Sequence, residues 1–145
     1  MVTVSMNSID GFYQSWSSGQ KLATERALTK ITAVSAQTNM QGDQVTIRLL
    51  NEGNFPLSRF ASWDVILKYG DGDTIWLPYR QTAPGWNISG IYFQELPESL
   101  HPGILDPGEE MDIVLQTTTP VSENVTNMAM VSTYNGITAR ILFRR

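Results

Sequence analysis

The sequence of 145 residues contains no cysteine, and this absence excludes several kinds of protein at once. Without thiols there is no disulfide, no thiolate nucleophile and no zinc site built on cysteine. The fold must therefore be held together by its hydrophobic core, which a single domain of this length is large enough to build.

Positive charge is scarce as well. The 10 Lys and Arg residues are scattered along the chain against 14 Asp and Glu, which gives a net charge of −4. A surface that binds nucleic acid needs clustered Lys and Arg to neutralise phosphates, so we expect no nucleic-acid partner. Hydrophobic residues make up 41% of the chain and charged residues 17%, a composition typical of globular domains rather than disordered ones.

Long hydrophobic runs are missing too. No stretch approaches the roughly 18 apolar residues of a membrane-spanning helix, and the start lacks the basic and apolar regions of a secretion signal. We therefore expect either a cytosolic protein or one whose membrane anchor lies upstream of Met1.

Residues 9–28 have the spacing of a helix. Their apolar residues recur three, four and seven positions apart: Ile9, Phe12, Tyr13, Trp16, Ala23 and Ala27. We expect Ser8 to cap this helix and Gly19 to break or fray it, because glycine costs about 1 kcal/mol in a helix interior. The stripe is interpreted as the packing surface of a stalk, in which Phe12, Tyr13 and Trp16 are candidate protein-contact residues.

From Lys30 onward the pattern changes to the two-residue alternation of β-strands. Strand candidates separated by turn residues lie at 31–39, 44–51, 63–69, 74–79, 87–96, 111–119, 127–134 and 137–143. Gly90 interrupts one of these runs, where we expect a β-bulge. Short strands at this spacing predict an all-β, antiparallel Ig-like sandwich of seven or eight strands with a short N-terminal helix.

The chain accordingly divides into a helical stalk segment, residues 1–28, and a β-sandwich domain, residues 29–145. Within the sandwich, Asn135-Gly136 joins the last two runs. This pair is favoured in a type I′ turn, in which both central residues have positive φ, so we predict a type I′ hairpin there.

The segment Asp71-Gly72-Asp73 suggests a calcium loop at first sight. A loop of the EF-hand type needs an oxygen ligand at its fifth position and a glutamate at its twelfth, where this chain has Ile75 and Thr82. Because the flanking runs alternate as strands, we predict the tip of a hairpin, and we expect no metal site and no cofactor.

No catalytic arrangement stands out. His101, the single histidine, lies in a Pro-Gly loop without any nucleophile-elbow pattern in the chain, so we expect an exposed loop histidine. Carboxylates gather at Glu95 and Glu98 and again at 109–112, but nothing in the sequence sets a pair across a cleft, as a glycosidase requires. The sequence therefore predicts no catalytic residue and no enzyme.

Four tryptophans remain to be explained. Trp63 lies on the inward face of its strand, Trp76 lies on the outward face, and Trp86 lies in or beside a loop. Exposed tryptophans stack on sugar rings or fill pockets in partner proteins. Trp76 and Trp86 therefore join the stalk aromatics as candidate protein-contact residues, unless a second layer or the helix covers them.

Several short motifs follow one another in a familiar order. The helix leads into Thr29-Lys30-Ile31, a later strand ends in Asn51-Glu52-Gly53, and the runs GILDPGEEMDIVL and YNGITARILF close the chain. In this order they resemble the soluble domains of archaellum stator and accessory proteins of the F and G type, and related type IV pilin-like surface proteins. The resemblance extends over residues 9–145 and lacks the family's hydrophobic span, which we expect upstream.

The resemblance implies a mechanical, non-enzymatic role outside the cytoplasmic membrane, with an N-terminal membrane anchor in the native protein. It implies partners in a surface layer or in a filament, bound through strand edges and aromatic anchors. It does not separate a stator from a filament subunit. The apolar stripe also predicts self-association, as a dimer. The alternative, drawn from Trp76 and Trp86, is a carbohydrate-binding or adhesive sandwich.

Overall fold

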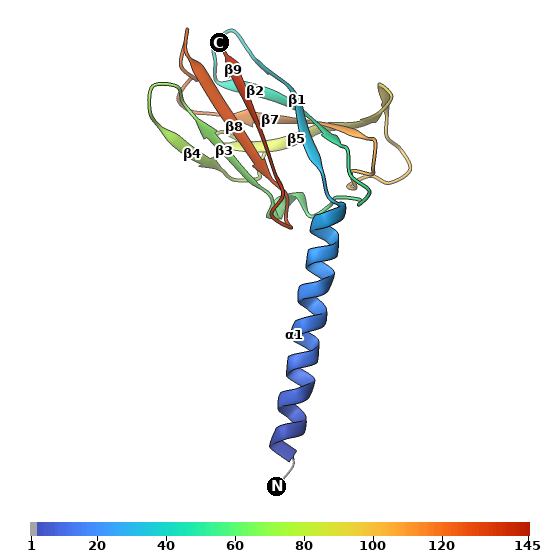
Figure 1. The fold of residues 1–145 in the computed structure, drawn as a ribbon. Coiled ribbons are helices and arrows are strands. Elements are labelled where there is room, and N and C mark those ends of the chain that lie inside the picture. Colours follow the sequence, from blue (N-terminus) through green and yellow to red (C-terminus); the bar gives the residue numbers. More distant parts are fainter. Residues whose placement is uncertain (1–2) are drawn as a thin grey trace.

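One long helix leads into two stacked antiparallel β-sheets, as Figure 1 shows. The computed structural model describes the backbone of residues 3–145 and the side chains of residues 15–145. The expected all-β sandwich with an N-terminal helix is confirmed. Within the described part of the chain, none of the helices is both long enough and apolar enough to cross a membrane.

The helix α1 runs from Thr3 to Leu28 without interruption. It begins before the predicted cap at Ser8 and continues through Gly19, so both of those expectations are wrong. The cost of one helical glycine, about 1 kcal/mol, is small beside the cooperative hydrogen bonding of a continuous helix. Figure 1 shows that α1 projects from the sandwich, which it meets only at its C-terminal end. The predicted contact residues Phe12 and Tyr13 lie outside the described side chains.

The first sheet has five strands in the order β1-β2-β7-β5-β6. They are β1 Ile31–Thr38, β2 Gln44–Asn51, β7 Glu110–Gln116, β5 Gly85–Phe93 and β6 Leu96–Pro97. The register of β5 against β7 shifts between Ile88 and Gly90, which confirms the bulge predicted from Gly90.

The second sheet has four strands in the order β4-β3-β8-β9. They are β4 Thr74–Leu77, β3 Asp64–Lys68, β8 Thr126–Ser132 and β9 Thr138–Arg144, and the short helix η1 Phe60–Ser62 precedes β3. Residues 3–145 form nine strands rather than seven or eight, because the predicted run 87–96 divides into β5 and the two-residue β6.

The core lies between the two sheets. The inward residues of β2, β3 and β7 are fully buried: Val45, Ile47, Leu49, Val65, Leu67, Met111, Ile113 and Leu115. Each such side chain contributes about 1.5–3 kcal/mol when it leaves water, so the alternating pattern of these strands fixes which of their faces is turned inward.

The last hairpin differs from the predicted type I′ turn. Of its central pair only Gly136 has a positive φ, 85°. The Gly136 N–H donates to the Thr133 carbonyl at 2.9 Å, and the Thr133 N–H donates to the Ile137 carbonyl at 2.8 Å. This is the longer hairpin loop in which a turn is followed by a left-handed glycine. The longer loop lets the Asn135 side chain reach a buried position beside α1.

Candidate functional site: a stalk joint, an exposed sheet face and an acidic pocket

The end of α1 is tied to the sandwich by a set of hydrogen bonds, which we call the stalk joint. The Asn54 N–H donates to the carbonyl of Leu28, the last helical residue, at 2.8 Å. The Thr29 hydroxyl donates to the Glu25 carbonyl at 2.6 Å and accepts from the Asn135 amide at 2.9 Å. Two loops of the sandwich therefore hold the last turn of the helix, and satisfy groups that a helix end leaves unpaired.

Asn51 and Gly53 shape the first of these loops. Asn51 is fully buried, and its amide donates to the carbonyls of Phe55 and Leu105, both at 2.9 Å. Its carbonyl oxygen accepts from the Gly53 N–H at 3.0 Å. A Cβ at Gly53 would lie 2.4 Å from the Leu28 carbonyl oxygen, so only glycine allows the loop to approach the helix end.

The motifs that carry the family resemblance thus meet in space. Thr29, Asn51 and Gly53 stand far from Asn135 in the sequence, yet all four build the stalk joint. Residues from three of the four motifs that carry the resemblance therefore set how the stalk leaves the sandwich.

Of the three tryptophans of the sandwich, two are buried and one is exposed. Trp63 is 2% exposed, which confirms its inward placement, and Trp76 is 58% exposed on the outer face of β4. Trp86 is fully buried, with its ring edge-on against Tyr79 at 4.7 Å between centroids. A buried ring does not reach a partner, so the prediction of Trp86 as a contact residue is wrong.

Trp76 belongs to an apolar band on the outer face of the four-stranded sheet. In the strand register, Ile66 lies opposite both Trp76 and Met130, and Met128 lies opposite Leu142. Trp76 and Leu142 are exposed, and the other three are half-buried. Contiguous exposed apolar residues often mark protein–protein contact surfaces, whereas single scattered ones do not.

Basic residues border this band. Lys68, Arg140 and Arg144 are all exposed on the same sheet, and in the described part of the chain none of the three forms an ion pair with an acidic side chain. The sequence indicated Trp76 but not the band around it. Met128 and Met130 alternate with buried apolar residues in β8, so the middle of that strand has no polar residue that shows which of its faces is turned outward.

On the stalk, Trp16 is 57% exposed. Its side chain does not pack on the sandwich, so it is available for contact with another molecule.

The Asp71-Gly72-Asp73 segment is the tip of the β3–β4 hairpin, as predicted. The Tyr69 N–H donates to the Asp73 carbonyl at 2.7 Å, and the Asp71 carboxylate accepts from the Ser122 hydroxyl at 2.6 Å. In the described residues, no group of three or more acidic or histidine side chains is arranged to hold a metal ion.

The carboxylates near β7 form an ion-pair network. The Arg48 guanidinium donates to both oxygens of Asp112 at 2.8 and 2.9 Å, and it lies 3.3 Å from Glu95 and 3.4 Å from Glu110. These contacts raise the pKa of Arg48, with the Asp112 hydrogen bonds as the largest cause. The network accounts for three of the acidic residues noted in the sequence.

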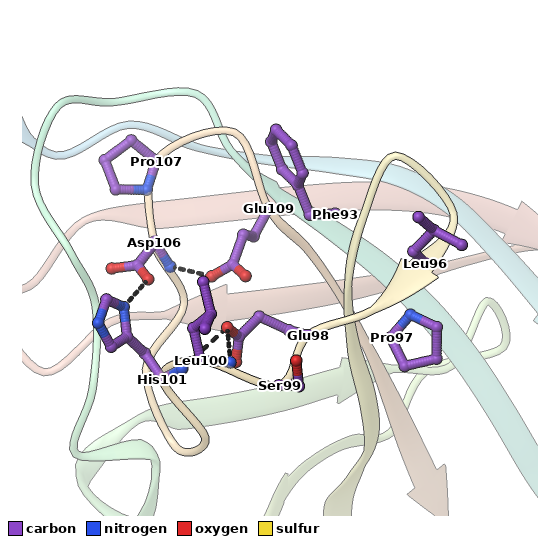
Figure 2. Close-up of a pocket in the computed structure, with 10 residues that line it drawn as sticks. All are labelled: Phe93, Leu96, Pro97, Glu98, Ser99, Leu100, His101, Asp106, Pro107 and Glu109. Carbon is purple, nitrogen blue, oxygen red and sulfur yellow. Dashed lines mark hydrogen bonds and ion pairs between the residues drawn. The ribbon is translucent and has the colours of Figure 1, made fainter.

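Glu98 and Glu109, the other acidic residues noted in the sequence, border a pocket of about 390 Å³, which Figure 2 shows. Apolar side chains form its walls: Phe93, Leu96, Pro97, Leu100 and Pro107. Its polar residues are Glu98, Ser99, His101, Asp106 and Glu109. We refer to it as the acidic pocket.

Within the acidic pocket, His101 Nδ1 lies 2.7 Å from an Asp106 carboxylate oxygen. This hydrogen bond and the Asp106 charge raise the pKa of His101. The histidine is exposed in its loop, as predicted. Sequence reasoning did not foresee its pairing with Asp106, although a spacing of five residues across a Pro-Gly turn is a signal for such contact.

Comparison with known proteins identifies the fold. No protein-family model matches the sequence, and no curated protein sequence matches it either. Among solved structures, the archaellum periplasmic stator protein FlaG from Sulfolobus acidocaldarius has a TM-score of 0.65 and 21% identity, over 80% of this chain and 100% of that one.

The complex of the stator proteins FlaF and FlaG from the same organism gives a TM-score of 0.64 and 21% identity, over 80% of this chain and 90% of that one. The archaeal flagellum of Methanospirillum hungatei strain JF1 gives 0.58 and 8%, over 99% of this chain and 83% of that one. The fold is thus one used by archaellum stator and flagellum proteins. FlaG is among the proteins that share it, as the sequence resemblance predicted.

Proposed function

We propose that this protein is a non-enzymatic component of an archaellum, and that it acts outside the cytoplasmic membrane as a stator-type anchoring domain. The observation that carries the proposal is the stalk joint. The residues of the family resemblance build it, in a sandwich whose fold matches FlaG over all of that chain.

The stalk joint suits a mechanical role. A stator must hold its position against a turning or pulling load, and a flexible linker would absorb such a load rather than transmit it. Here the carbonyl of Leu28 is bonded to Asn54, and Thr29 is bonded to Asn135. At 1.5 Å per residue, the 26 residues of α1 form a spacer about 39 Å long, which holds the sandwich at a fixed distance.

The surface of the stalk favours a stator over a filament subunit. Most described side chains of α1 are exposed, and among them are Ser, Gln, Lys, Glu and Arg. A solvent-exposed spacer carries polar residues over much of its surface, whereas a helix buried among neighbouring subunits is apolar over most of its surface. Trp16, Leu22 and Leu28, at 57%, 44% and 40% exposure, supply local apolar contact points among these polar residues.

The partners we propose are proteins of the surface layer or of the filament assembly, with the apolar band around Trp76 as the contact surface. In the native protein a membrane anchor preceding α1 would complete the arrangement. The alternative of a carbohydrate-binding sandwich has lost one of its two motivating residues, since Trp86 is fully buried.

Photo-crosslinking in cells tests this proposal. A benzophenone amino acid replaces Trp76 in the protein expressed in its own organism, and adducts are identified by mass spectrometry. We expect adducts with archaellum or surface-layer proteins. The control is the same replacement at Met40, which is 91% exposed in the β1–β2 turn and lies outside the apolar band. Equal labelling from both positions, or labelling of glycans alone, would contradict the proposed contact surface.

A further inference from the structure

The walls of the acidic pocket are apolar and open to water. Leu96 is 70% exposed and Leu100 is 84% exposed, and the ring of Phe93 completes this side of the cavity. Large apolar side chains held in water around a concave space gain free energy when an apolar group fills it. The pocket therefore favours an occupant with an apolar body.

Glu98 carries an unsatisfied oxygen in the floor of this pocket. Its Oε1 accepts from the N–H groups of Leu100 and His101 at 2.7 and 2.8 Å, which fixes the side chain. Its Oε2 is buried and has no hydrogen-bond partner in the described part of the chain. A buried carboxylate oxygen without a partner is costly, so this atom points to a missing donor.

Glu109 adds a second carboxylate to the same space. Only 4% of its surface is exposed, and its Oε1 accepts from the Asp106 N–H at 2.6 Å. Among the described residues, no hydrogen bond reaches its other oxygen. Burial raises the pKa of Glu109. Figure 2 shows the Glu98 and Glu109 side chains reaching from two loops toward the same part of the pocket, beside Leu100.

The neighbouring ion pair does not neutralise these two acids. His101 is already hydrogen-bonded to Asp106, so its charge, when it is protonated, is balanced within that pair. Lys or Arg side chains are absent from the pocket lining. Glu98 and Glu109 therefore hold the uncompensated negative charge of the cavity.

We propose that the acidic pocket is a socket for a basic side chain, Lys or Arg, of a protein partner different from this chain. Its aliphatic stem lies against Leu96, Leu100 and Phe93, and its charged group donates hydrogen bonds to Glu98 and Glu109. Lys and Arg combine an apolar stem with a cationic tip, the two properties that the pocket requires. A partner protein is the source that fits the protein–protein role proposed above, on which this choice of source depends.

The probe for the test is 1-butylguanidinium chloride, an analogue of the arginine side chain, added to the ¹⁵N-labelled whole chain at pH 7. We expect saturable changes in amide shifts confined to residues 93–109. 1-Pentanol has an apolar stem of similar length without the charge, and it should bind at least about fivefold more weakly, since one charged hydrogen bond contributes roughly 1 kcal/mol or more.

Two variants test the carboxylates. Glu98→Gln and Glu109→Gln keep the oxygen that accepts from the backbone, so the loops should stay folded. The chemical-shift dispersion of the amide signals outside the pocket checks that each variant is folded. Each should weaken butylguanidinium binding at least about fivefold. Glu123→Gln is the matched control, because Glu123 pairs with Arg145 outside the pocket, and it should leave binding unchanged.

The proposal is overturned if pentanol binds as well as butylguanidinium, if the two variants bind like the wild type, or if shift changes spread over all acidic residues. It is also overturned if sedimentation shows a dimer that butylguanidinium separates, because the occupant would then be a second copy. Any of these results leaves the archaellum proposal standing, since that proposal rests on the fold and on the stalk joint.

Discussion

Two buried asparagines, Asn51 and Asn135, hold the loops of the stalk joint. Asn51 donates to two backbone carbonyls and Asn135 donates to Thr29, and all three residues are buried. A buried amide that loses its partner costs about 1–3 kcal/mol, so each residue holds its loop in one arrangement. The geometry of the stalk joint is thus determined by single side chains rather than by a large contact area.

The strongest prediction at this scale concerns Gly136, whose φ is 85°. Replacement by valine places a β-branched residue in the left-handed region, and we expect the free energy of unfolding to fall by about 1–3 kcal/mol. Chemical denaturation measures the change. Gly136→Asn is the control, because asparagine tolerates this conformation, and it should lose clearly less stability. Equal stability of the valine variant and the parent would contradict the assigned turn.

Single residues also show where prediction from sequence fails. Trp63 lies between polar neighbours in a run with two-residue alternation, and this alternation alone predicts that its side chain is turned inward. Trp86 follows a Pro-Gly pair that resembles a loop, but β5 begins at Gly85 and carries the ring into the core. Whether Trp86 is exposed or buried depends on the pairing of β5 with β7, and no local sequence pattern predicts that pairing.

At the scale of elements, α1 and the sandwich are joined without a linker. The helix ends at Leu28, β1 begins at Ile31, and Thr29 between them is buried and hydrogen-bonded on both sides. Such a connection leaves no residues free to act as a hinge, so the direction of the stalk follows that of the sandwich.

Asn135→Ala tests this connection. We expect a loss of about 1–3 kcal/mol in the free energy of unfolding, because the Thr29 hydroxyl loses its donor in a buried position. Amide hydrogen exchange should also accelerate at Asn54, whose N–H caps the helix end. Asn54→Ala is the control: its backbone rather than its side chain makes the bond, and the side chain is exposed, so stability should change by less than about 0.5 kcal/mol. Similar losses in both variants would contradict a joint built on Asn135.

Most elements could be predicted because their patterns are long and regular. The alternation in β2, β3 and β7 indicates both the strand and its buried face. The start of α1 and the division of the run 87–96 could not be predicted. The helix begins among Ser, Thr and Asn residues with weak preferences, and the turn between β5 and β6 places Gln94 and Glu95 at positive φ without a glycine.

At the scale of the whole molecule, the stalk and the sandwich expose different surfaces. Trp16 stands on a helix that projects from the sandwich, as Figure 1 shows, and the band around Trp76 lies on the outer face of one sheet. The candidate site is therefore distributed over the molecule. The sequence indicated its aromatic members, but the acidic pocket could not be predicted, because it forms between the β5–β6 hairpin and a loop that follows it.

The exposed stalk leads to a prediction about self-association. Since Trp16 does not pack on the sandwich, we expect the stalk to pair with a second copy, and the whole chain to be a dimer at micromolar concentration. Sedimentation of the whole chain and of a chain starting at Thr29 measures this. The shorter chain, which corresponds to the sandwich alone, should be a monomer. A monomer in both cases would show that the stalk does not pair.

Deletion of the gene in its own organism tests the central claim, a stator-type anchoring role, most directly. Swimming speed is recorded and filaments are counted by electron microscopy, with the intact gene returned on a plasmid as the control. The account predicts that swimming is lost, that filaments are still assembled in normal number, and that the returned gene restores swimming. Normal swimming without the gene would contradict an archaellum role, and loss of the filaments themselves would show a building subunit instead of an anchor.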